Sequence, residues 1–139
     1  MIGLRQGIQT GFKNNEMRVW GCYFFTLVQM ACLRRRITYS DDGLIELFNH
    51  CKQVGWIGNN SFINNAVAIV NYCLGENTIR DITRGQEIPD AAEHIIVHMQ
   101  KPTVQHFAIC NTKGEITWDS WTPSAAGQNF PVLNYRVLV

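Results

Sequence analysis

The sequence predicts an α+β fold in which N-terminal helices come first and a mainly antiparallel sheet follows. Three observations carry this prediction. The first half of the chain has apolar residues at helical spacing, with capping residues where helices would begin. The second half has short segments rich in β-branched and aromatic residues, separated by turn residues. The length of 139 residues, 46% of them hydrophobic and 17% charged, predicts one domain, residues 1–139, with a single core.

The first helix is expected over residues 22–36. Its sequence, CYFFTLVQMACLRRR, is a long apolar run that ends in Arg34–Arg36. Positive side chains in the last turn of a helix complement the helix dipole, so the three arginines favour a helix end over an anion site. Residues 1–18, which precede this helix, are polar and contain glycine. They indicate irregular structure or a short edge strand.

Two further helices complete the first half. Ser40, followed by acidic residues, is a capping signal for a helix that ends at Gly55. Asn60 or Ser61 would cap another helix, which stops at Gly75. The apolar stripes of these two helices consist of Leu44, Leu47, Phe48 and Cys51, and of Ile63, Val67, Val70 and Leu74.

Four strands are expected in the second half. They are HIIVHMQ (94–100), VQHFAICN (104–111), EITWDSW (115–121) and VLNYRVLV (132–139). Pro102 separates the first two, a Thr-Lys-Gly turn at 112–114 the middle pair, and a proline-bounded segment, 123–131, the last two. Helices followed by an antiparallel sheet are typical of α+β domains.

The composition excludes several classes of protein. A formal net charge of +1 gives no electrostatic basis for a nucleic-acid or anionic-membrane partner, and no apolar run approaches a membrane span. Five dispersed cysteines and the absence of a signal-like N-terminal stretch predict a reduced, cytoplasmic protein. Four of the thiols are expected to be unpaired core residues: Cys32, Cys51, Cys73 and Cys110. No metal or other cofactor is expected, because His94 and His98 lack an adjacent acid and a third ligand.

The fifth cysteine, Cys22, follows Trp20 and Gly21 at the start of the first helix. It is either a small buried hydrophobe or a thiol with chemistry to perform. A nucleophilic cysteine needs a base and a group that orients the base. The turn at 112–114 places residue 106 opposite residue 120 or 121, which makes Asp119 a cross-strand or diagonal neighbour of His106. His50, His94 and His98 have no such neighbour.

These segments resemble the papain-like cysteine peptidase superfamily, in particular compact members of the size of the bacteriocin-processing (double-glycine) peptidase domains. GCYF is similar to the start of the nucleophile helix, HFAI to the histidine strand, and DSW to the Asn-Ser-Trp that follows in papain. The resemblance covers nearly the whole chain. It implies that Cys22 is the nucleophile, His106 the base and Asp119 the orienting acid, acting on a peptide or peptide-like amide through a thioester. The helix dipole and a protonated His106 would favour the thiolate.

One position departs from the superfamily pattern. A glutamine usually stands six residues before the nucleophile and helps to bind the oxyanion, whereas this chain has Glu16 there. Asn15 carries a suitable amide and is the substitute that the sequence offers. The resemblance also implies that Trp20, Gly21 and Trp121 line the substrate cleft. The alternatives are a catalytically degenerate papain-fold module that binds a peptide or partner, and a small acyltransferase.

Overall fold

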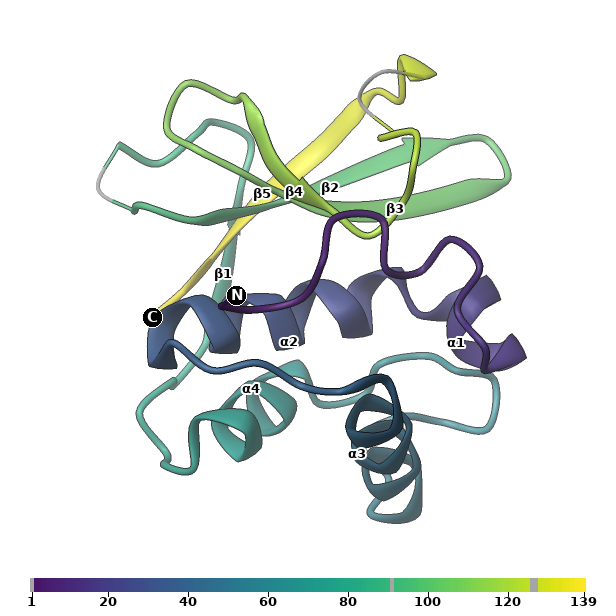
Figure 1. Ribbon diagram of the computed structural model, residues 1–139. Coiled ribbons are helices and arrows are strands. Elements are labelled where there is room, and N and C mark those ends of the chain that lie inside the picture. Colours follow the sequence, from purple (N-terminus) through teal and green to yellow (C-terminus); the bar gives the residue numbers. More distant parts are fainter. Residues whose placement is uncertain (1, 91, 126–127) are drawn as a thin grey trace.

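The computed structural model describes residues 2–90, 92–125 and 128–139, which form four helices followed by a five-stranded antiparallel sheet (Figure 1). The predicted α+β class is confirmed. The helices are α1 (Asn15–Trp20), α2 (Cys22–Arg35), α3 (Asp41–Gln53) and α4 (Ala66–Leu74), and the strands are β1 (Ile82–Gly85), β2 (Ile95–Lys101), β3 (Val104–Cys110), β4 (Ile116–Asp119) and β5 (Val132–Leu138). The strand order in the sheet is β1-β5-β2-β3-β4.

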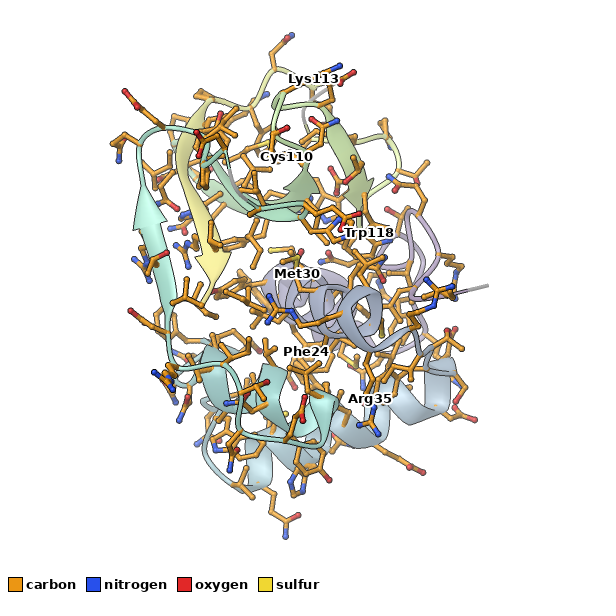
Figure 2. All side chains as sticks on the ribbon, turned by 90° about the vertical axis from the view of Figure 1, so that its left-hand side faces the viewer. Phe24, Met30, Arg35, Cys110, Lys113 and Trp118 are labelled. Carbon is orange, nitrogen blue, oxygen red and sulfur yellow. The ribbon has the colours of Figure 1, made fainter. Side chains whose placement is uncertain are left out.

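Helix α2 lies between the sheet on one side and helices α3 and α4 on the other (Figure 1). Met30 extends from α2 toward the sheet, whereas Phe24 extends toward α3 and α4 (Figure 2). Every residue from Phe24 to Cys32 is buried. A helix that packs on two sides is apolar around its circumference, which explains why residues 22–36 show a continuous apolar run rather than one stripe.

Three elements differ from the sequence prediction. Helix α1 was not expected: Asn14 caps it by accepting a hydrogen bond from the Met17 N–H. The helix expected to begin at Asn60 or Ser61 begins at Ala66, because the Asn65 side chain caps it. Strand β1 was also not expected, since most of this four-residue edge strand is exposed and has no alternating apolar pattern.

The two faces of the sheet bury different residues. The face toward α2 carries Ile96, Phe107, Ile109, Trp118 and Leu138, which join the core of the helices. The opposite face carries Ile95, Val97, Met99, Ala108 and Cys110, which form a second cluster. Because side chains alternate along a strand, His106 and Asp119 belong to this opposite face.

The hairpin of β3 and β4 has the register that the turn predicts. Ala108 pairs with Asp119 and Ile109 with Trp118, so that residue 106 is in line with residue 121. In the described part of the chain, β4 pairs with β3 only along Ala108–Cys110. The edge of β3 over Val104–Phe107 is therefore left for another partner.

Gly21 joins α1 to α2 at a point where the two helices are closely packed. It is the C-cap of α1 and the N-cap of α2, and a Cβ atom there would lie 2.3 Å from the Met17 carbonyl oxygen. We expect Gly21→Ala to lower the free energy of unfolding by about 1–3 kcal/mol, because the backbone must shift to relieve the overlap. Urea unfolding measures this. Gly85→Ala is the control, since its Cβ would meet nothing closer than 3.9 Å, and equal effects of the two variants would contradict the prediction.

Candidate active site

The thiol of Cys22 lies against the open edge of β3. Cys22 is the first residue of α2 and is half-buried, and its Sγ donates to the Gln105 carbonyl at 3.8 Å. One turn later, the Thr26 hydroxyl donates to the Phe107 carbonyl at 3.2 Å. Cys22 and Thr26 of α2 thus donate hydrogen bonds to backbone carbonyl groups on the part of β3 that does not pair with β4. The thiol consequently sits beside the peptide groups on either side of His106.

His106 and Asp119 form a buried pair, as the hairpin register predicts. His106 Nε2 lies 2.5 Å from Asp119 Oδ1, and both side chains are fully buried. The Trp121 ring stacks on the imidazole with a centroid separation of 3.7 Å and an interplanar angle of 24°. The predicted contact between the histidine and the acid is confirmed, and Trp121 covers it.

The Asp119 carboxylate accepts four hydrogen bonds. Oδ1 accepts from His106 Nε2 and from the Trp121 N–H at 2.8 Å, and Oδ2 accepts from the Ser124 hydroxyl at 2.7 Å and the Ala125 N–H at 3.1 Å. Burial by itself raises the pKa of Asp119, but the hydrogen bond and charge of His106, with the donors of Trp121 and Ser124, hold the pKa below its ordinary value. Asp119 is therefore ionised at neutral pH, and four hydrogen bonds hold its carboxylate in position.

This carboxylate determines the tautomer of His106. A carboxylate only accepts hydrogen bonds, so Nε2 carries a proton and Nδ1 of the neutral ring is a lone-pair acceptor. Nδ1 is buried and has no hydrogen-bond partner among the described residues. It is also the ring nitrogen nearer to the His106 backbone, which is the part of β3 that the Cys22 thiol contacts. A basic nitrogen without a hydrogen-bond partner among the described residues is thus on the β3 segment that the Cys22 thiol contacts.

The resting thiol is protonated, which corrects the expectation of a favoured thiolate. Burial raises the pKa of Cys22 to about 11, and the negative charge of Asp119 acts in the same direction. The backbone N–H groups of Tyr23, Phe107 and Cys22 lower the pKa but do not offset burial. The helix N-terminus is therefore not sufficient to ionise this thiol, and ionisation needs a base that takes the proton directly.

Asn15 and Glu16 do not reach the thiol. Asn15 is exposed at the first position of α1, and its Oδ1 accepts from the Arg18 guanidinium. Glu16 pairs with Lys52 at 2.8 Å and accepts from the Ser61 hydroxyl at 2.5 Å, which lowers its pKa. Glu16 thus holds α1 against α3 and the loop before α4, and Asn15 is not positioned to bind an oxyanion at Cys22.

Gln9 is an amide that the sequence analysis did not identify. It is 1% exposed, its Nε2 donates to the Arg18 carbonyl at 3.0 Å, and its Oε1 accepts from the Ser120 hydroxyl at 2.7 Å. The backbone N–H of Gln9 also donates to the Ser120 carbonyl at 2.8 Å. Gln9 precedes Cys22 by thirteen residues, and α1 occupies the interval, so the usual spacing of six gave no signal.

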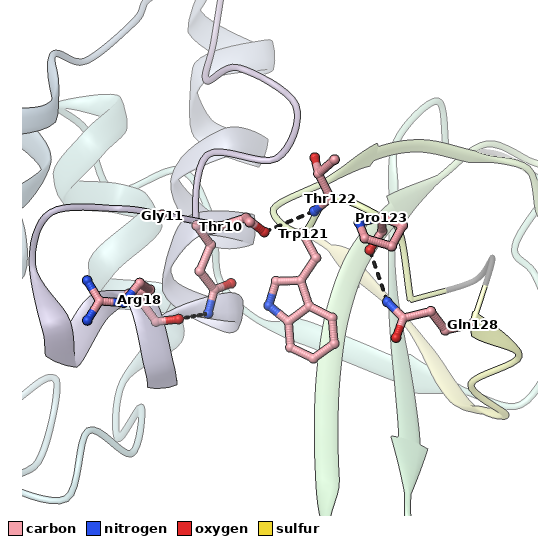
Figure 3. Close-up of a pocket in the computed structure, with 8 residues that line it drawn as sticks. Thr10, Gly11, Arg18, Trp121, Thr122, Pro123 and Gln128 are labelled. Atoms are coloured by element: carbon pink, nitrogen blue, oxygen red, sulfur yellow. Dashed lines mark hydrogen bonds between the residues drawn. The ribbon is translucent and has the colours of Figure 1, made fainter.

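A cavity of about 290 Å³ opens beside the histidine–acid pair (Figure 3). Its lining residues are Gln9, Thr10, Gly11, Arg18, Trp121, Thr122, Pro123 and Gln128. The Thr122 N–H donates to the Thr10 hydroxyl across this cavity at 3.0 Å. Of the three residues expected at a cleft, Trp121 lines this cavity, Trp20 is 65% exposed at the end of α1, and Gly21 is buried at the helix junction.

The remaining thiols are structural. All five cysteines are free, and the four outside the site are buried, as predicted: Cys32, Cys51, Cys73 and Cys110. Burial raises the pKa of each of them. Within the described ranges, no group of three or more His, Cys, Asp or Glu side chains is arranged to hold a metal ion, and no helix is long and apolar enough to cross a membrane.

The chain also matches a known family. The model of a family described as "Protein of unknown function, DUF261" matches residues 7–139, and the chain belongs to this family. Searches of curated proteins and of solved structures found no match to the chain.

Proposed function

We propose that this member of the DUF261 family is a papain-like cysteine peptidase or amidase that cleaves a peptide or peptide-like amide. The observation that carries the proposal is the arrangement around His106. Its Nε2 is bound to a buried carboxylate, while its Nδ1 is buried without a partner on the strand that the Cys22 thiol contacts. A base whose second nitrogen is oriented by an acid is the arrangement that activates a thiol.

In the proposed reaction, Cys22 exchanges its weak bond to the Gln105 carbonyl for one to His106 Nδ1. The thiol proton passes to Nδ1 as the sulfur–carbon bond forms and the carbonyl becomes an oxyanion. His106 then gives this proton to the amine as the carbon–nitrogen bond breaks, leaving a thioester. Water attacks the thioester while His106 takes its proton, and the proton returns to the sulfur as the acid departs.

The oxyanion of the proposed reaction must be stabilised by hydrogen-bond donors close to the Cys22 sulfur. The backbone N–H of Cys22 at the start of α2 is one, since no hydrogen bond within α2 uses it. Gln9 replaces Asn15 as the proposed side-chain donor, because its amide is buried and Ser120, the residue after Asp119, holds it next to Trp121. The free thiols support a reducing compartment such as the cytoplasm.

The pH dependence of alkylation tests this function. A peptide vinyl sulfone should modify Cys22 ahead of the four buried cysteines, with a rate that levels off well below pH 9 because His106 accepts the proton. In His106→Gln, the rate should instead rise about tenfold per pH unit toward the thiol pKa of about 11. Mass spectrometry of the intact and digested protein gives the rate and the site. Identical pH profiles for the two proteins would overturn the proposal and leave a binding module.

A further inference from the structure

A strip of polar side chains crosses the helix-facing side of the sheet beside the thiol. It consists of Gln105 on β3, His98 on β2, Asn134 and Arg136 on β5, and Arg84 on β1. The register pairs His98 with Asn134 and Arg84 with Arg136. Elsewhere this face carries apolar residues that pack on the helices. A polar strip on such a face requires an explanation.

Gln105 connects the strip to the Cys22 thiol. The Gln105 carbonyl accepts from Cys22, while the Gln105 side-chain oxygen lies 2.9 Å from His98 Nε2. Tyr23, which follows Cys22, stacks on Phe107 with a centroid separation of 4.1 Å. The Tyr23 hydroxyl accepts from Arg136 Nη1 at 3.1 Å. The strip and the thiol are thus parts of one continuous set of contacts.

His98 is neutral in this set. A guanidinium only donates hydrogen bonds, so His98 Nδ1 accepts from Arg136 Nη2 at 3.1 Å, and Nε2 carries the proton that Gln105 accepts. Burial lowers the pKa of His98, and the charges of Arg136 and Arg84 lower it further. Both ring nitrogens are in use, so His98 neither replaces His106 as the base nor offsets the charge of Arg136.

Arg136 is a buried cation without an anion. It is 4% exposed, and its hydrogen-bond acceptors are the neutral groups of Tyr23, His98 and Asn134. The described residues place no carboxylate on Arg136 or on Arg84, its exposed cross-strand neighbour. Three of the five guanidinium N–H donors are used. Buried charges in proteins are normally paired, and a second cation opposite adds repulsion.

We propose that Arg84 and Arg136 bind a carboxylate of the substrate, and this inference deepens the proposed function by naming the substrate class. Arg136 Nη1 lies 3.1 Å from the hydroxyl of Tyr23, the residue after Cys22, and Arg136 Cζ lies 4.9 Å from the centroid of the Phe107 ring on β3. The guanidinium is thus directly beside the part of β3 that the thiol contacts. The substrate is therefore a peptide with an acidic side chain close to the amide that is attacked.

Peptide binding to the Cys22→Ala variant tests this without requiring catalysis. The probes are fluorescent heptapeptide amides that differ only in one Glu or Gln, moved through each position. In fluorescence polarisation, the Glu peptide should bind at least about tenfold more tightly than its Gln partner at one or two positions. The preference should weaken as salt is raised, since Arg84 is exposed.

Charge reversal provides the matched variants. Arg84→Glu in the Cys22→Ala background should abolish or invert the Glu preference, whereas Arg80→Glu, an equal change at an exposed residue outside the strip, should leave it intact. Equal affinities of the Glu and Gln peptides at every position, no binding of either, or equal effects of the two reversals would overturn the inference. Failure of the catalytic proposal is distinct: the peptides then bind with the Glu preference, but Cys22 is not alkylated with the pH profile described above.

Discussion

Replacement of Cys22 by alanine is expected to abolish peptide-amide hydrolysis while leaving the fold intact. The proposed mechanism passes through a thioester on the Cys22 sulfur. Removal of a nucleophile that acts as one unit with its base lowers the rate of the reaction by a factor of up to about 10⁶. The thiol makes one weak hydrogen bond, and alanine is a strong helix former at the start of α2. A pool of fluorogenic peptide amides provides the measurement, and circular dichroism checks the fold.

His106→Gln is the companion variant. Glutamine can still donate a hydrogen bond to Asp119, but it cannot take a proton from the thiol, so the rate should fall by about 10²–10⁴. His50→Gln is the control, because His50 stacks on Tyr72 among the helices and is expected to leave the rate unchanged. Full activity in either the Cys22 or the His106 variant would contradict the assignment of the thiol and its base.

The parts of the site that local sequence rules determine were predictable. A short turn after β3 fixes the register, and the register brings His106 and Asp119 to the same face within thirteen residues of each other. The position of Cys22 at the start of α2 follows from the end of the polar segment and the beginning of the apolar run. Each of these inferences depends on neighbours in sequence, where periodicity and turn chemistry are informative.

The parts that depend on distant contacts were not predictable. Gln9 is held by Ser120, 111 residues away, and the polar strip joins residues of four strands with one of α2. The pKa of Cys22 was predicted in the wrong direction because burial against β3 outweighs the helix N-terminus. Helix α1 has no apolar stripe, and the loop before α4 places its cap at Asn65 rather than at Asn60 or Ser61. Tertiary packing decides these features, and one sequence does not contain a local signal for them.

Asp119→Ala is expected to lower the free energy of unfolding by about 3–5 kcal/mol, the largest stability change that the structure predicts. The substitution removes the carboxylate that accepts four hydrogen bonds, from the His106 ring, the Ser124 hydroxyl, and the Trp121 and Ala125 N–H groups, at a position where Asp119 and His106 are both fully buried. Removing the acceptor of a buried hydrogen bond costs about 1–3 kcal/mol, and partial rearrangement of the site keeps the total below the sum of the four losses. Urea unfolding at neutral pH measures the effect.

Graded variants of the same carboxylate separate its contacts. Asp119→Asn keeps an oxygen for His106 and Trp121, but its NH₂ group then faces the Ala125 N–H, so we expect a smaller loss of about 1–3 kcal/mol. Ser124→Ala removes one donor and leaves the carboxylate with three, and it should cost about 1 kcal/mol. A cost for Ser124→Ala equal to that of Asp119→Ala would contradict the view that all four donors contribute.

The pH dependence of the Asp119 effect has a definite sign. The pKa of Asp119 is lower in the folded protein than in the unfolded chain, where an aspartate has a pKa of about 3.9. The stabilisation from its ionised form is therefore fully present above about pH 4 and is lost as the pH falls through the folded pKa. The difference in unfolding free energy between the wild type and Asp119→Asn should be constant from pH 7 to about 5 and should shrink below about 4. A difference that persists unchanged at pH 3 would mean that Asp119 stabilises the fold through its shape and not through its charge.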